Sequence, residues 1–178
     1  MDTLSEEDRR RNMSRVRSKD TKPEVLLRKL LFSKGFRFRL HGKKLPGTPD
    51  IVLPKFRTAI FVHGCFWHLH DCKRGTLPET RREWWKSKLE KNRERDRKNF
   101  LLLNEMGWRV AVVWECAFRK HGQDSKEHII SELSLFFRSK DLLFLEIPPA
   151  ANATPNLDST EGKENSGEEK EPMAEIPK

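Results

Sequence analysis

The segment Thr58-Ala59-Ile60-Phe61-Val62-His63-Gly64-Cys65-Phe66-Trp67-His68-Leu69-His70-Asp71-Cys72 passes from an apolar run into a dense set of chemically active side chains. Its first five residues are apolar enough to predict a strand in the centre of a sheet. The remainder holds two of the three cysteines and three of the six histidines of the chain, with a Phe-Trp pair among them. The sequence therefore predicts a buried strand that ends in a loop with a chemical role.

Further strands and helices are predicted on both sides of this segment. Period-two alternation and short apolar runs predict strands at Phe36–Leu40, Asp50–Leu53, Thr58–Val62 and Arg109–Trp114. Capping residues and apolar periodicity predict helices after Ser5, from Thr21 to about Gly35, from Glu79 or Thr80 to Glu105, and from Asp124 to about Phe137. This order of elements predicts an α/β fold built around a mixed sheet.

Charge is unevenly distributed along the 178 residues. Residues 151–178 hold three Lys/Arg against seven Asp/Glu, a net charge of −4. The net charge of the whole chain is +9, so residues 1–150 carry a net charge of +13. So basic a domain favours a polyanionic partner, nucleic acid first, although solubility alone would also explain it. From Pro148 onward Pro, Asn, Ser, Glu and Lys dominate, which predicts a disordered acidic tail.

The chain has no run that is long and apolar enough to span a bilayer, and its first residues lack the pattern of a secretory signal. We therefore expect a cytoplasmic protein that does not bind membranes. In a reducing compartment, a cluster of Cys and His indicates metal binding or catalysis before it indicates disulfides.

The three cysteines can be combined into one metal site. Cys65, His70 and Cys72 can converge on one ion from a single loop, and Cys116 at a strand end would complete a Cys3His set. That ligand type is typical of closed, structural zinc sites. His68 is a competing ligand and Asp71 a weaker one. The alternative is a set of buried cysteines and surface histidines.

Two histidines of the loop remain if His70 binds zinc. His63 and His68 could each accept a proton from water near pH 7, or be no more than polar loop residues. Asp50, in a Pro-Asp pair at a strand entry, is a typical carboxylate for holding Mg²⁺ at a phosphodiester, and Glu24 could add another acid. A strand-entry Asp is also often only a turn residue.

Aromatic side chains lie between the candidate ligands. Phe66 and Trp67 could insert between base steps of DNA, and Met13 on its Arg-rich segment could be a third wedge. Core packing is the ordinary alternative for all three. Trp84 and Trp85, on the basic helix, could equally stack on bases or pack in the core.

Six short motifs follow one another along the chain: Asn12-Met13, Leu45-Pro46-Gly47-Thr48-Pro49-Asp50, Phe61-Val62-His63-Gly64-Cys65-Phe66-Trp67-His68, Asn92-Arg93-Glu94-Arg95-Asp96, Gly107-Trp108-Arg109-Val110 and Val113-Trp114-Glu115-Cys116. Together they closely resemble the very short patch repair (Vsr) DNA mismatch endonucleases, over about residues 8–138. The resemblance implies a restriction-endonuclease-like fold, a mixed sheet flanked by helices with a structural zinc site.

The resemblance also implies a function. Such enzymes nick one strand 5′ to the thymine of a T:G mismatch left by deamination of 5-methylcytosine. The substrate would be double-stranded DNA with that mismatch. A MutL-type mismatch-repair protein and a repair polymerase would be partners, and the chain would act as a monomer in the bacterial cytoplasm.

Carried over position by position, the resemblance gives each singled-out residue a role. Asp50 corresponds to the Mg²⁺-binding carboxylate, the Val62 backbone carbonyl to a second ligand, and His68 to the residue that activates water. His63 and Glu24 would support the site. The wedges would be Met13, Phe66 and Trp67, and the zinc ligands Cys65, His70, Cys72 and Cys116.

The chain is then expected to divide into a DNA-contacting helical segment (1–20), an endonuclease domain (21–147) and the acidic tail (148–178), which would bind a partner or inhibit the enzyme. The strand after Asp50 lacks the acid and the lysine of related nucleases and has His63 instead, as in the Vsr type. Two other functions stay open: a restriction-type nuclease that cuts intact duplex, and a zinc-stabilised DNA-binding protein without catalysis.

Overall fold

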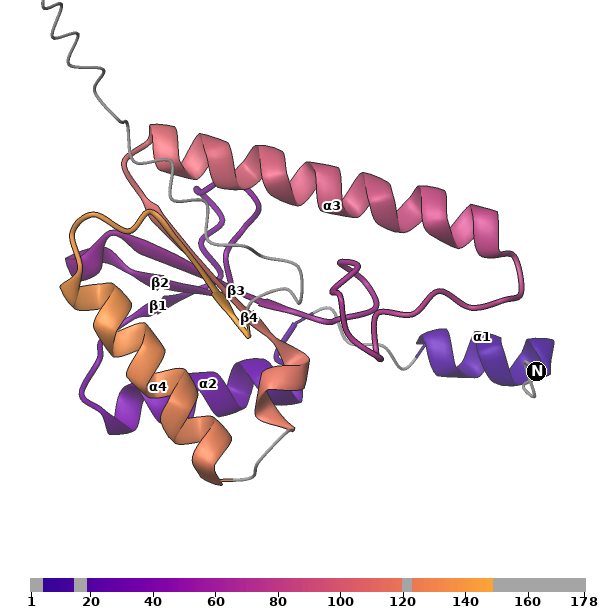
Figure 1. The fold of residues 1–178 in the computed structure, drawn as a ribbon, viewed down its shortest axis with the longest axis horizontal. Helices are drawn as coiled ribbons and strands as arrows, with labels where there is room; N and C mark the ends of the chain where they lie inside the picture. The colour runs from indigo at the N-terminus through magenta and orange to yellow at the C-terminus, as the bar shows by residue number, and fades with distance from the viewer. Residues whose placement is uncertain (1–4, 15–18, 120–122, 149–178) are drawn as a thin grey trace, which may run out of the picture.

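The computed structural model describes residues 5–14, 19–119 and 123–148, and in this part of the chain one sheet is covered by helices on both faces (Figure 1). The strands are β1 (Arg39–Leu40), β2 (Ile51–Leu53), β3 (Thr58–His63), β4 (Arg109–Trp114) and β5 (Phe144–Ile147). The helices are α1 (Glu6–Ser14), α2 (Lys22–Ser33), α3 (Arg82–Glu105) and α4 (Gln123–Arg138). The predicted α/β class and mixed sheet are confirmed.

The five strands lie in the order β1-β2-β3-β4-β5. β1, β2 and β3 pair antiparallel, whereas β3, β4 and β5 run parallel. Parallel neighbours need a crossover connection, which α3 supplies between β3 and β4, and α4 between β4 and β5. The carboxyl ends of β3, β4 and β5 therefore share one edge of the sheet, and β2, running the opposite way, begins at that same edge.

Two predictions of strands needed correction. A strand was expected at Phe36–Leu40, but only the last two of these residues, Arg39–Leu40, form a strand. The strand β5 was not predicted, because four residues beside the Pro-rich tail show too short a pattern. Its pairing with β4, rather than any local signal, makes it a strand.

Side chains alternate between two cores, one on each face of the sheet. α2 and α4 cover one face and α3 the other (Figure 1). The core under α2 and α4 is built from Leu27, Leu31, Ile51, Leu53, Ile60, Ala111, Val113, Ala117, Ile129, Ile130, Leu133, Phe136, Phe137 and Ile147. The core under α3 is built from Ala59, Phe61, Cys65, Leu103, Val110, Val112, Trp114 and Cys116. Strand periodicity thus turns His63, two residues after Phe61, toward α3.

The start of α2 and the end of α3 follow the predicted signals, whereas α3 begins at Arg82, two residues after the predicted Thr80, with no side-chain cap at Arg81. At α2 the Oγ1 of Thr21 accepts a bond from the Glu24 N–H at 3.5 Å, and the Glu24 carboxylate accepts one from the Thr21 N–H at 3.3 Å, which confirms the predicted capping box. α3 stops before Gly107, whose φ of +73° is a left-handed conformation that glycine adopts without strain.

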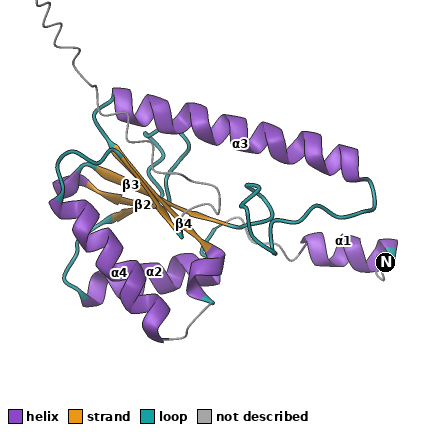
Figure 2. Cartoon of the chain, in the orientation of Figure 1, coloured by secondary structure: helices purple, strands orange, loops and turns teal. Residues whose placement is uncertain are grey.

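Helix α1 lies apart from the sheet, on the side of the long loop that joins β3 to α3 (Figures 1 and 2). The Ser5 Oγ accepts a bond from the Asp8 N–H at 3.1 Å, as a helix cap does. Within the described ranges, no helix combines the length and the apolar character that crossing a membrane requires. Almost all of the predicted acidic tail (148–178) lies outside the described residues, since they end at Pro148.

Leu133→Ala should lower the free energy of unfolding by about 2–5 kcal/mol, because it leaves a cavity in a close-packed core. Leu133 is fully buried on α4, whereas Leu135 on the same helix is 56% exposed. Leu135→Ala is therefore the matched control and should change stability by less than about 0.5 kcal/mol. Urea denaturation of both variants measures the difference, and equal effects would contradict the placement of α4.

Candidate active site and metal centre

A cleft of about 880 Å³ opens at the edge of the sheet where β3 ends and β2 begins. It is lined by all four residues that the sequence predicted to be catalytic: Glu24, Asp50, His63 and His68. These residues, 5 to 44 positions apart in the chain, meet there because β2 and β3 are antiparallel neighbours and α2 packs beneath them. The geometry of each side chain shows what the cleft can do.

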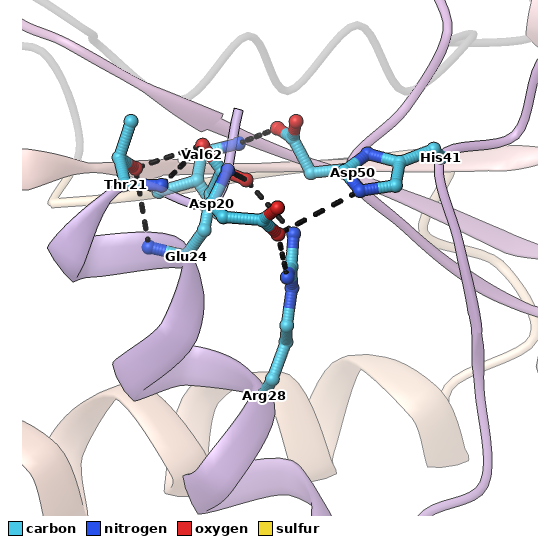
Figure 3. A network of polar contacts seen from close by, with 7 residues as sticks. All are labelled: Asp20, Thr21, Glu24, Arg28, His41, Asp50 and Val62. Carbon is cyan, nitrogen blue, oxygen red and sulfur yellow. Dashed lines mark hydrogen bonds and ion pairs between the residues drawn. The ribbon is translucent and has the colours of Figure 1, made fainter. Parts of the chain in front are cut away.

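Asp50 is held by the backbone of the neighbouring strand. Its Oδ2 accepts a hydrogen bond from the Val62 N–H at 2.8 Å (Figure 3). Burial raises the pKa of Asp50 to about 6; the Val62 N–H opposes the rise and the charge of Glu24 adds to it. A carboxylate that is poorly solvated and close to another acid is a place where a cation is favoured.

Glu24 belongs to the same network but is already fully engaged. It is only 3% exposed, and its two oxygens accept from the Asp20 and Thr21 N–H groups and from the Arg28 guanidinium at 2.9 Å (Figure 3). His41, which the sequence analysis did not single out, lies beside Asp50 with its Nε2 3.7 Å from the Asp20 carboxylate. Glu24 therefore acts on Asp50 through its charge and by fixing the start of α2.

His63 and His68 form a stacked pair. Their ring centroids are 3.7 Å apart and their planes differ by 10°. Burial, with His68 and Arg95 nearby, holds the pKa of His63 well below its ordinary value, so His63 is neutral at pH 7. Because the two rings are parallel, the lone pairs of their nitrogens do not point toward one common position. His63 and His68 could therefore bind the same metal ion only if one of the two rings turned.

Asp96 on α3 is the residue of the site that sequence reasoning missed. Its Oδ2 lies 2.5 Å from Nδ1 of His68, and both side chains are largely buried. A carboxylate at Nδ1 fixes the ring and the tautomer, which leaves Nε2 of His68 as the basic nitrogen. Asp96 stood within a motif quoted above, but among the many charges of α3 its spacing gave no separate signal.

The predicted zinc ligands also come together. One donor atom from each of Cys65, His70, Cys72 and Cys116 lies within 4.8 Å of the others, and Sγ of Cys116 is 3.5 Å from Nδ1 of His70. Three sulfurs and one imidazole are a donor set that fits zinc. His68, the competing candidate, and Asp71, the weaker one, are not part of this group.

The loop that carries these ligands is tightly closed. The His70 N–H donates to the Cys65 carbonyl at 2.9 Å, and the Gly75 N–H donates to the Cys72 carbonyl at the same distance. A Cβ at Gly75 would lie 1.9 Å from the His70 carbonyl oxygen, so only glycine fits there. Trp114 joins the two centres, because its ring stacks on His70 at 4.3 Å and meets His63 edge-on at 5.3 Å.

The aromatic residues form a small cluster at the start of α3. Phe66 and Trp67 are half-buried, meet each other edge-on at 5.1 Å, and contact Trp85 at 5.1 and 6.1 Å. Trp84 is 49% exposed, with the Lys88 ammonium 4.7 Å from its ring centroid. Met13 falls in α1, but its side chain is outside what the structure describes. None of these rings is in either core of the sheet.

Comparison with known proteins gives a consistent family. Residues 1–74 match the family model described as DNA mismatch endonuclease Vsr. The type II nicking enzyme V.XorIIP of Xanthomonas oryzae pv. oryzae is 57% identical over 115 residues, which are 65% of this chain and 85% of that protein. The DNA mismatch endonuclease Vsr of Escherichia coli K12 is 44% identical over 125 residues, which are 70% and 80% of the two chains.

With a mixed α/β fold and a carboxylate and paired histidines in one cleft, these similarities define the class. The chain belongs to the Vsr family of DNA mismatch endonucleases.

Cys116→Ser should remove bound zinc and lower the free energy of unfolding by roughly 4 kcal/mol or more, because the loop loses its cross-link to the end of β4. Elemental analysis of the purified protein and thermal melting measure the two effects. Wild-type protein stripped by a zinc chelator is the control and should melt where the variant melts. Unchanged zinc content and melting would overturn the zinc site.

Asp50→Asn should stabilise the protein at pH 7 in buffer without added Mg²⁺. The pKa of Asp50 is about 6 in the fold against 3.8 ordinarily, so its stabilising contribution is complete below 3.8 and is lost as the pH rises through 6. The amide avoids that loss and can still accept from Val62. We expect a gain of about 1–3 kcal/mol in the free energy of unfolding at pH 7, vanishing toward about pH 4.

Urea denaturation at the two pH values tests this expectation. Asp141→Asn, at an exposed position, is the matched control and should leave stability unchanged at both. A loss of stability at pH 7, or a gain that does not depend on pH, would show that Asp50 is not the buried carboxylate described here.

Proposed function

We propose that the chain is a Mg²⁺-dependent endonuclease that nicks one strand of double-stranded DNA 5′ to the thymine of a T:G mismatch arising from 5-methylcytosine deamination. The observation that carries the proposal is that Asp50 and the His68–Asp96 pair line one cleft. The relatives named as a mismatch endonuclease and as nicking enzymes support it. We also infer that the mixed sheet is of the restriction-endonuclease-like type.

The metal site would be built by Asp50 and the backbone carbonyl of Val62. Both are hard oxygen donors of the kind Mg²⁺ prefers. The raised pKa of Asp50, caused by burial with Glu24 nearby, supports this assignment because a bound cation would offset both effects. When bound, Mg²⁺ would polarise the phosphate and stabilise the leaving oxygen.

His68 is proposed as the general base. Nε2 of His68 takes a proton from the attacking water, while Asp96 at Nδ1 orients the ring and stabilises its positive charge. Asp96 is thus a positioning residue. His63, neutral and stacked on His68, limits the movement of that ring without adding charge to it.

Recognition of the mismatch is assigned to Phe66, Trp67 and Met13. Wedges inserted between base pairs pay an unstacking cost that is smaller at a mispair. Phe66 and Trp67 lie between the zinc ligands Cys65 and His70, so the metal would keep their loop rigid. The contact of both rings with Trp85 supports adding Trp85 to this group.

Other expectations stay predictions. They are the division at residues 20 and 147, the monomeric state, the MutL-type and polymerase partners, and the cytoplasmic location.

Nicking of a strand-labelled T:G duplex in Mg²⁺ tests the proposed function, with a fully paired duplex of the same sequence as the control. We expect one cut, on the thymine strand of the mismatched duplex alone. Asp50→Ala should abolish the cut while mismatch binding persists, and His68→Ala should slow it by roughly 100- to 10,000-fold, as loss of a general base does.

The other outcomes separate the rival functions. Cleavage of both strands of the paired duplex would indicate a restriction-type nuclease. Binding without cleavage in any divalent metal would indicate a zinc-stabilised DNA-binding protein. Full nicking by the Asp50→Ala variant would overturn the assignment of the metal site.

A further inference from the structure

A second cleft, of about 810 Å³, adjoins the candidate active site. It shares His63, His68 and Asp96 with the candidate active site. Its distinguishing feature is a set of three arginines from α3: Arg82, Arg93 and Arg97. We call it the arginine cleft.

The three arginines are exposed and form no salt bridge with a residue of the described part of the chain. Three carboxylates line the arginine cleft as well, Asp71, Asp96 and Glu146. Asp96 is engaged by His68, and Glu146 accepts a 2.6 Å bond from Nε1 of Trp114. The carboxylates of Asp96 and Glu146 keep their charge, but their printed partners are His68 and Trp114 and not the arginines, so the three guanidinium groups can still pair with an acidic ligand.

The strand register places the start of the acidic tail beside this cleft. Ile147 pairs with Val113, and Val113 pairs with Val62, so β5 ends level with the active-site end of β3. Glu146 itself lines the arginine cleft. Residue 148, the last described residue, thus follows β5 at the edge of the sheet where both clefts open.

The sequence after this point is suited to the arginines in length and charge. Residues 149–178 are 30 residues, and even a third of them could span roughly 30 Å when extended. The acidic residues among them are Asp158, Glu161, Glu164, Glu168, Glu169, Glu171 and Glu175. A tether of this length gives its charges an effective concentration on the order of millimolar at a nearby site.

We infer that the acidic tail binds the arginine cleft of its own chain and there competes with DNA. A DNA strand that crosses the active site comes close to the same arginines, since the two clefts share His63, His68 and Asp96. Weak, non-specific contacts with phosphates are displaced by the tail, whereas a mismatch that engages the wedges displaces the tail. The contact between the tail and the arginine cleft does not depend on the proposed function. The competition with DNA does rest on the proposed function.

The test uses full-length chains that differ only in tail charge. In one variant the seven acidic residues of the tail become Gln or Asn, and in the matched control Lys163, Lys170 and Lys178 become Gln. Without DNA, the NMR signals of the Nε–Hε groups of Arg82, Arg93 and Arg97 should shift in the first variant. The acid-neutralised tail should also raise affinity for fully paired duplex at low salt by roughly tenfold, and the lysine variant should lower it.

Each result decides a separate step. Unchanged arginine signals would overturn the binding of the tail in the arginine cleft, even if DNA affinity changed. Shifted signals with unchanged affinity for paired duplex would overturn the competition. Because the NMR measurement needs neither DNA nor cleavage, failure of the proposed nicking activity would leave the tail contact decided on its own evidence.

Discussion

The hydrogen bond from the Val62 N–H to the Asp50 carboxylate, 2.8 Å long, joins the start of β2 to the end of β3. It exists because the two strands are antiparallel and in a register that pairs Ile51 with Ile60. The same register puts His63 one residue past Val62, at the edge of the sheet and turned toward α3. Asp50, the histidine pair and Asp96 can meet only if this pairing holds, so the site depends on the sheet more than on its loops.

The arrangement of the site also lowers the stability of the fold while it serves the proposed chemistry. Burial raises the pKa of Asp50 to about 6 and holds that of His63 well below its ordinary value. Both shifts record charge that the fold disfavours. Capping of α2 by Glu24, packing of Trp114 and the closed Cys/His loop hold these groups in place nonetheless. Perturbed pKa values of this kind are expected at sites whose groups bind a ligand or take part in catalysis.

Much of this architecture was predictable from the sequence, because its signals are local. The capping box at Thr21, the apolar run of β3 and three of the four Cys3His residues, Cys65, His70 and Cys72, each lie within one short stretch of sequence. β5 and Asp96 were missed because their meaning depends on partners far along the chain. β5 becomes a strand only beside β4, and Asp96 is distinguished from the other acids of α3 only by His68.

One ring connects the two centres, since Trp114 stacks on His70 and meets His63 edge-on. The indole comes from the last residue of β4, while both histidines come from the segment after Phe61. The loop and the strand end therefore form one inseparable module. A transfer of the Cys/His loop to another scaffold would have to include the end of β4. Without it the histidine pair would lose its packing against the Trp114 ring.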